Sequence, residues 1–92
     1  MAEKRDIPIK IPEAVIGGVY ANQMVVGHTR EEFLLDFVNL FPPQGVDNAL
    51  VIVSPGHLKR MIRALQENLR KYEATHGEVA EAAAPAGDGF VN

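Results

Sequence analysis

The chain has 92 residues, a formal net charge of −3 and no cysteine. The lack of cysteine excludes disulfide bonds, thiolate metal sites and cysteine nucleophiles, and the negative charge gives no overall attraction to nucleic acid or to an anionic membrane. A single domain of this size has a marginal core unless disulfides, a metal or oligomerisation support it, and we expect oligomerisation to do so.

The first residues carry no sign of export or membrane insertion. Residues 1–6 are polar, so we expect them to be disordered, and they lack the apolar stretch of a secretory signal. No segment reaches the ~20 apolar residues of a membrane span, and the expected compartment is the cytoplasm.

Residues 7–12 alternate isoleucine with proline or lysine. This alternation favours an extended conformation, and because proline cannot donate to a ladder, the segment is predicted to be an edge strand or an arm. The sequence leaves two places for it to dock, namely its own sheet or a neighbouring subunit.

Three strands are predicted next, at residues 19–28, 32–41 and 48–53, from their content of β-branched and aromatic residues. A polar connection of hairpin length joins the first two strands. Pro42 and Pro43 end the second strand because proline cannot continue a ladder, and residues 44–47 are predicted to be a loop. Short connections between consecutive strands favour an antiparallel meander.

The second strand is apolar on both sides. Its faces carry Phe33, Leu35, Phe37 and Phe41 on one side and Leu34, Val38 and Leu40 on the other. A half-exposed strand alternates apolar with polar residues, so this pattern predicts cover on both faces. One helix covers only one face, and a second copy of the chain is expected to cover the other.

A long helix is predicted from Pro55 to about His76. Ser54 is a preferred N-cap, Pro55 suits the first helical position, and Gly77 suits the end. The helix would be roughly 33 Å long against ~18 Å for a typical strand, so its far end should project beyond the sheet.

The apolar positions of this helix recur at alternating spacings of four and three residues. They are Leu58, Ile62, Leu65, Leu69 and Tyr72. This spacing is typical of a helix that packs lengthwise against another helix, although it also fits packing on a sheet. Met61 widens the stripe over the first turns. Together with Phe33, Leu35 and Phe37, the five helix positions form the predicted oligomer interface.

The rest of the helix surface is basic. Its cations are Lys59, Arg60, Arg63, Arg70 and Lys71. Such a face can bind the phosphates of a nucleic acid. Glu67 can instead pair with cations four residues away, and no aromatic residues interleave with the cations as single-strand binding requires. Nucleic-acid binding is therefore the less favoured interpretation.

No pattern of catalytic residues is found, and we expect no enzyme activity. Ser54 and His57 lie three residues apart, but no carboxylate is placed to orient the histidine. His57, His28 and His76 are not spaced like metal ligands, so no metal or cofactor is expected. Asp36 lies in an apolar strand, where a lysine or arginine of the helix is its expected partner.

The final segment, residues 77–92, is rich in alanine, glutamate, glycine and proline, and we expect it to be a flexible acidic tail. The predicted organisation is one α+β domain, residues 7–76. In this domain an antiparallel β-meander of three strands precedes one long C-terminal helix, and residues 7–12 are either a further edge strand or an arm.

Four short motifs occur along the chain in a fixed order. They are Tyr20-Ala21-Asn22, Glu32-Phe33-Leu34-Leu35-Asp36-Phe37, Ser54-Pro55-Gly56-His57-Leu58-Lys59-Arg60 and Leu65-Gln66-Glu67-Asn68-Leu69. Through these motifs, residues 18–73 resemble a family of short bacterial and archaeal proteins known only as a domain of unknown function. The resemblance implies no activity, cofactor or site residue. A meander followed by a long helix is also similar, at the level of fold, to the SecB-type export chaperones, which assemble as dimers of dimers and hold unfolded chains in apolar grooves.

The sequence therefore favours a non-enzymatic oligomeric module, a dimer or tetramer, that acts as a structural or protein-binding unit and binds apolar polypeptide segments as SecB does. The alternative is a small DNA-binding regulator that uses the basic face of the helix. A chaperone needs apolar patches left over after assembly, which Phe33, Phe41 and the isoleucine arm can supply. A DNA binder needs several uncompensated cations on one surface.

Overall fold

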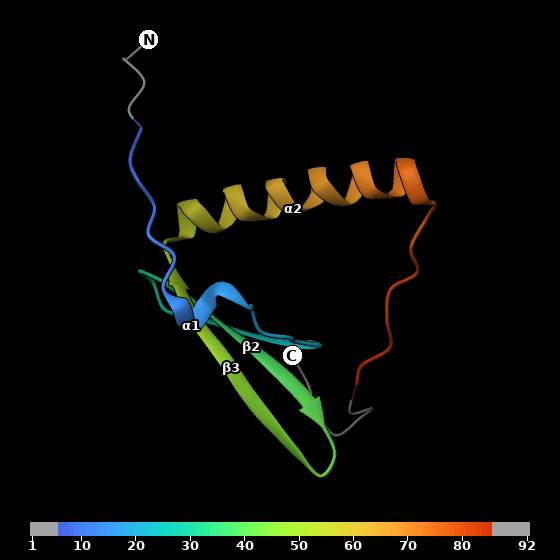
Figure 1. Ribbon diagram of the computed structural model, residues 1–92, viewed down its shortest axis with the longest axis horizontal. Helices are drawn as coiled ribbons and strands as arrows, with labels where there is room; N and C mark the ends of the chain where they lie inside the picture. The colour runs from blue at the N-terminus through green and yellow to red at the C-terminus, as the bar shows by residue number, and fades with distance from the viewer. Residues whose placement is uncertain (1–5, 86–92) are drawn as a thin grey trace.

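The computed structural model describes residues 6–85. The expected disorder of residues 1–5 and the expected flexibility of residues 86–92 lie outside this range. The elements in chain order are α1 (Glu13–Ile16), β1 (Gln23–His28), β2 (Phe33–Phe41), β3 (Gln44–Val53) and α2 (Pro55–His76). Three antiparallel strands in one sheet are followed by a long C-terminal helix, so the fold is α+β, as the sequence predicts (Figure 1).

The sheet is a meander in the order β1-β2-β3, with β2 in the centre. Met24 and Val26 of β1 lie opposite Phe37 and Leu35 of β2, and Leu35 lies opposite Val51 of β3. Because side chains alternate across a strand, these five residues share one side of the sheet, here called the helix face. The other side is called the outer face.

The turn between β2 and β3 is tighter than predicted. The loop expected at residues 44–47 is part of β3, because only Pro42 and Pro43 form the turn and pairing resumes directly between Phe41 and Gln44. Gly45 makes this possible, since a Cβ at this position would lie 2.5 Å from Cδ1 of Leu40. A side chain at this position would require the Leu40 side chain to move, whereas the nearest backbone atom, the Asn39 carbonyl oxygen, is 3.7 Å away.

The pairing of β2 with β3 shifts between Phe37 and Val38, which lie opposite Ala49 and Asp47. Asn48 is therefore the extra residue of a β-bulge. Its side-chain Nδ2 donates to the carbonyl of Tyr20 at 2.8 Å. The bulge thus ties the segment before β1 to the far strand of the sheet.

The first strand is shorter than predicted and begins at Gln23 instead of residue 19. At Asn22 the backbone N–H still donates to the Val38 carbonyl at 3.0 Å. The side chain extends the pairing by one step: Nδ2 donates to the carbonyl of Leu40 at 3.0 Å, and Oδ1 accepts from the Leu40 N–H at 2.8 Å. The backbone can therefore leave the sheet while Leu40 remains paired. Upstream, the short helix α1 follows Pro12 and was not predicted. Residues 6–12 form no strand within the structure.

The limits of α2 agree with the prediction. Ser54 Oγ accepts the N–H of His57 at 3.1 Å, and Pro55 stands in the first turn. At the other end, Gly77 has a φ of 94°, a conformation that L side chains rarely adopt, and its N–H donates to the Glu73 carbonyl at 2.9 Å. Both ends of the helix are therefore fixed by local sequence.

The molecule is unusually open for its size. Among residues 6–85, Leu35 is the single apolar side chain that is buried, at 2% exposure. The radius of gyration is 16.4 Å, whereas a compact chain of this length has about 12 Å. The accessible surface is 8305 Å², whereas a folded monomer of this mass exposes about 5300 Å². One chain therefore leaves much of its apolar surface in contact with water.

Candidate interaction surface

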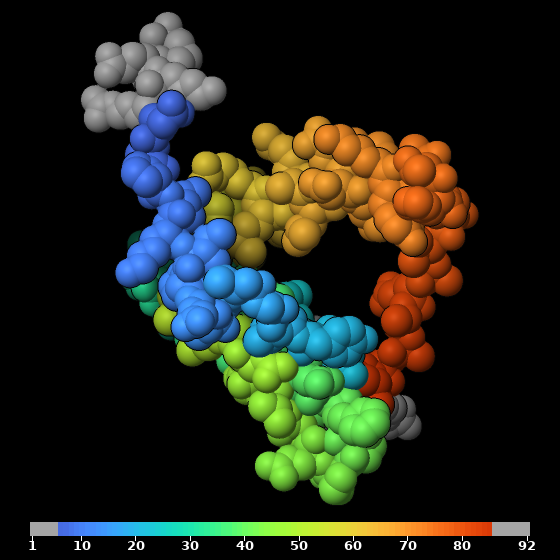
Figure 2. Space-filling view, in the orientation of Figure 1, coloured from blue at the N-terminus to red at the C-terminus, as the bar shows by residue number. Residues whose placement is uncertain are grey.

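An apolar groove lies between the helix face of the sheet and the first half of α2. Its volume is about 240 Å³, and it is lined by Met24, Val26, Leu35, Phe37, Leu58, Met61, Ile62 and Leu65. Figure 2 shows an open space between α2 and the rest of the chain. Every lining residue is apolar, so the groove offers no polar side chain to orient a small polar molecule.

Two regular periodicities build this groove. On the sheet, Met24 and Phe37 face each other across β1 and β2, as do Val26 and Leu35. On the helix, Leu58, Met61, Ile62 and Leu65 follow the spacing i, i+3, i+4, i+7, which gathers side chains on one side of a helix. The groove walls are therefore one face of a sheet and one face of a helix.

The groove is only partly closed by the chain itself. Leu65 is 68% exposed and Ile62 is 48% exposed, while Met24 and Val26 on the sheet are about two-fifths exposed. Side chains of this type gain roughly 1.5–3 kcal/mol each when they are fully removed from water. The groove thus retains a strong tendency to acquire further cover.

The apolar stripe of α2 continues past the groove. Leu69 and Tyr72 do not line it and are each 51% exposed. The Tyr72 ring lies 4.7 Å from the His76 ring, centroid to centroid. We call the five positions Leu58, Ile62, Leu65, Leu69 and Tyr72 the helix seam. The sheet partly covers the beginning of this seam and leaves its end bare.

Of the eight residues predicted as an interface, five meet in the groove: Leu35, Phe37, Leu58, Ile62 and Leu65. Phe33 lies further along the helix face, half-buried, with its ring 5.3 Å from the His28 ring. Leu69 and Tyr72 lie on the projecting part of α2. The prediction omitted Met24, Val26 and Met61. The width of the helix stripe points to Met61, whereas alternation puts Met24 and Val26 on one face of their strand and only the register of β1 against β2 places that face in the groove.

The outer face carries a pair of carboxylates. The bulge places Asp47 opposite Val38, and both residues lie on the same face as Asp36. A side-chain hydrogen bond with Asp47 raises the pKa of Asp36, and burial and the charge of Asp47 act in the same direction. The ion pair with a helix cation that the sequence predicts for Asp36 is therefore wrong. The reason is that α2 packs on the opposite face of the sheet.

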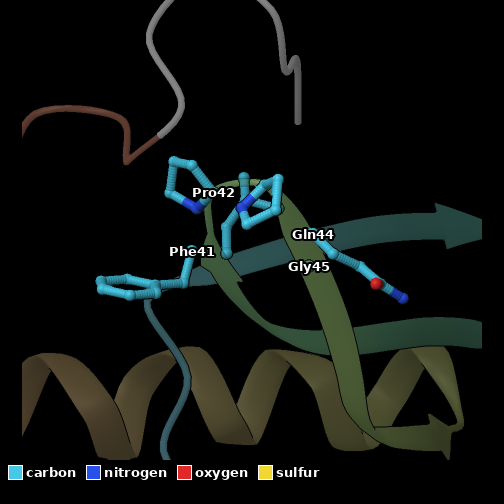
Figure 3. Close-up of a pocket in the computed structure, with 6 residues that line it drawn as sticks. Phe41, Pro42, Gln44 and Gly45 are labelled. Atoms are coloured by element: carbon cyan, nitrogen blue, oxygen red, sulfur yellow. The ribbon is translucent and has the colours of Figure 1, made fainter.

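A second, shallower hollow of about 200 Å³ lies at the tip of the β2–β3 hairpin. It is lined by Leu40, Phe41, Pro42, Pro43, Gln44 and Gly45. Figure 3 shows the Phe41 ring extending away from Pro42, and this side chain is 74% exposed. All the lining residues come from the turn and the strand ends beside it, and none of them is charged. This hollow is a feature of the turn, with an apolar projection beside it.

Ser54 and His57, considered from the sequence as a catalytic pair, form part of the N-terminus of α2. Ser54 accepts the backbone N–H of His57, and Nδ1 of the His57 ring lies 2.8 Å from Nη2 of Arg60. Within residues 6–85 no group of three or more histidine, aspartate or glutamate side chains could hold a metal ion. The Ser54 hydroxyl therefore serves as the predicted helix cap.

The cations of α2 lie on the side away from the groove. At 100° per residue, Arg60, Arg63, Arg70 and Lys71 fall on the half of the helix opposite the seam, Lys59 lies at the border of the two halves, and all five are exposed. Glu67 lies in the middle of this basic side. The apolar and basic surfaces of α2 are thus separate.

These features define a small α+β protein in which a three-stranded meander and one helix enclose an open apolar groove. The chain belongs to the family described as "Protein of unknown function (DUF3467)", which matches residues 1–81. No curated protein and no solved structure matches the chain. The likeness to SecB-type chaperones therefore stays an analogy. In the part of the chain that the structure describes, no helix is long and apolar enough to cross a membrane.

Proposed function

We propose that the protein is a non-enzymatic module whose first partner is a second copy of itself. Each α2 lies along the helix seam of its partner, so that each copy completes the cover of the other's groove. The assembled form then acts as a structural or protein-binding unit. No step of this function requires a metal, a cofactor or a chemical reaction.

The observation that carries the proposal is the apolar surface that one chain leaves exposed along the seam. There Leu65 is 68% exposed, and Leu69 and Tyr72 are each 51% exposed. Stable dimer interfaces remove about 800 Å² or more from each partner. Covering the groove and the seam in this way would bring the protein closer to the surface expected for its size. Segments 6–12 and 77–85, which have no strand or helix, account for part of the rest.

The charges beside the seam favour an antiparallel arrangement of the two helices. Lys59 and Glu73 flank the seam on the same side, near opposite ends of α2. In an antiparallel pair, Lys59 of one copy comes near the Glu73 of the other, and the two helix dipoles also oppose each other favourably. A parallel pair would not bring Lys59 of one copy near the Glu73 of the other, because the two residues lie near opposite ends of α2.

The proposal is tested by thermal unfolding at several protein concentrations. Because association stabilises only the folded state, Tm should rise by about 4 °C for each tenfold increase in concentration. Folding of a monomer is independent of concentration, so a constant Tm over a hundredfold range would contradict the proposal.

Binding of apolar polypeptide segments is the second part of the proposal. Phe41 at the hairpin tip lies outside both the groove and the seam, so that it remains exposed after the helices pair. We expect an apolar fluorescent dye or an apolar peptide to bind weakly, with little dependence on salt. A phosphate-binding helix would instead bind duplex DNA and lose most of its affinity between about 50 and 200 mM salt. Salt-sensitive DNA binding without uptake of the dye would favour the alternative function, a small DNA-binding regulator.

A further inference from the structure

Within residues 6–85, the segment from Ile7 to Pro12, here called the arm, packs against little of the rest of the structure. Ile7, Ile9 and Ile11 are 76%, 86% and 64% exposed. The only backbone hydrogen bond between the arm and another element of the described chain runs from the Val15 N–H to the Pro12 carbonyl. In Figure 1 the arm leads away from the sheet. The exposure of three isoleucine side chains within six residues is unfavourable in free energy.

The prolines give the arm one usable edge. In an extended chain, the N–H and C=O groups of alternate residues point to opposite edges. Ile7, Ile9 and Ile11 offer three donors along one edge. The other edge has one donor, at Lys10, because Pro8 and Pro12 have no N–H. The arm is therefore built to add to a sheet on one side and to stop further pairing on the other.

The sheet offers a matching edge at β3. This ten-residue strand lies at the border of the sheet, and its second half, Ala49 to Val53, is entirely apolar. Leu50 and Ile52 on its outer face are about half exposed. Within residues 6–85, no backbone hydrogen bond is formed by β3 outside its ladder with β2. Five residues of strand span ~17 Å, and the six residues of the arm span ~20 Å.

We propose that the arm of one copy adds as a strand to the free edge of β3 in a second copy. The isoleucines then pack beside the apolar residues of β3, and the proline edge closes the enlarged sheet against further addition. The chain just after the arm is held by α1 and by the hydrogen bond between Asn48 and Tyr20. The arm itself can therefore extend toward a second copy. This exchange rests on the self-association proposed above, and it adds a second contact between the copies.

The test uses a mixture of isotope-labelled and unlabelled full-length protein. Nuclear Overhauser effects filtered for contacts between copies should connect Ile9 and Ile11 to Leu50 and Ile52. If these contacts are found only within a single copy, the arm folds back on its own sheet, and the proposed exchange is overturned. No such contacts in a protein of dimeric mass would overturn the exchange and leave the proposed function standing. A monomeric mass would overturn both.

Two variants isolate the backbone pairing. Ile9→Pro removes a donor from the pairing edge and should raise the dissociation constant about tenfold. Lys10→Pro removes the donor on the opposite edge and should leave the dissociation constant unchanged. Equal effects of the two variants would contradict the one-edged arm. Ile9→Ala keeps the donor, so a loss as large as that of Ile9→Pro would show that only the side chain matters.

Discussion

The two halves of α2 carry the same apolar stripe in different surroundings. In the first half, Leu58 and Met61 are half-buried against the sheet, whereas in the second half Leu69 and Tyr72 have no sheet beneath them. A helical segment as short as one half of α2 has only marginal stability in water on its own. The first half is explained by packing within one chain. The second half has a reason to keep its stripe only if another surface covers it.

The largest effect is expected from Leu65→Asp, at the boundary between the two halves. Leu65 is 68% exposed in one chain, and a change at an exposed position usually alters stability by about 0.5 kcal/mol or less. If a partner covers Leu65, the new carboxylate is buried without a partner, and the cost rises to about 3 kcal/mol or more. We expect dissociation or unfolding, measured by light scattering and circular dichroism.

Arg63→Asp is the matched control, because the same new side chain then stands on the side of α2 away from the seam. It should leave the assembly intact. If Leu65→Asp were as harmless as Arg63→Asp, the second half of α2 would face water in the working protein.

A smaller effect is expected from Asp36→Asn on the outer face. The folded state raises the pKa of Asp36 above its ordinary value of 3.8. The folded state therefore favours the protonated form, and the stability linked to this group is present below the ordinary pKa and is lost as pH rises through the folded-state pKa. Asparagine resembles the protonated form at every pH. Near pH 7 the variant should thus be at least as stable as the wild type, and the difference should vanish in acid.

Thermal unfolding of the two proteins near neutral pH and in acid measures this difference. A wild type that is clearly more stable than Asp36→Asn at neutral pH would mean that the carboxylate gains a cation when the protein assembles. The outer face of the sheet would then be an interface between copies, in addition to the groove and the seam.

The smallest effect is expected from deletion of residues 78–92. In the described part of this segment, one exposed hydrogen bond is formed with α2, from the Val79 N–H to Glu73 Oε2 at 3.0 Å. Because Gly77 already ends the helix, Tm should change by no more than about 4 °C. A larger loss would show that the removed segment, and not a second copy, covers the end of the seam.

The sequence predicted the parts of the fold that local chemistry controls. Ser54, Pro55 and Gly77 each have a conformational preference strong enough to fix an end of α2, and strict alternation placed Phe33, Leu35 and Phe37 on one face. Local patterns did not predict that Asn22 replaces a strand residue, because its partner Leu40 is eighteen residues away. The Asp36–Asp47 pair was missed for a similar reason, since it depends on the bulge at Asn48.

The candidate site was predicted in outline from the same patterns. The five seam positions follow from helical spacing, whereas Met24 and Val26 joined the groove only when the register of β1 against β2 was known. Spacing along one chain also cannot show which surface lies opposite Leu69 and Tyr72. That depends on the partner.

The molar mass in solution tests the central claim most directly. Size-exclusion chromatography with multi-angle light scattering at micromolar concentration should give at least twice the chain mass of 10.1 kDa. This result is expected because one chain leaves the groove and the seam open to water. A cooperatively folded protein with a mass of 10.1 kDa would contradict the account.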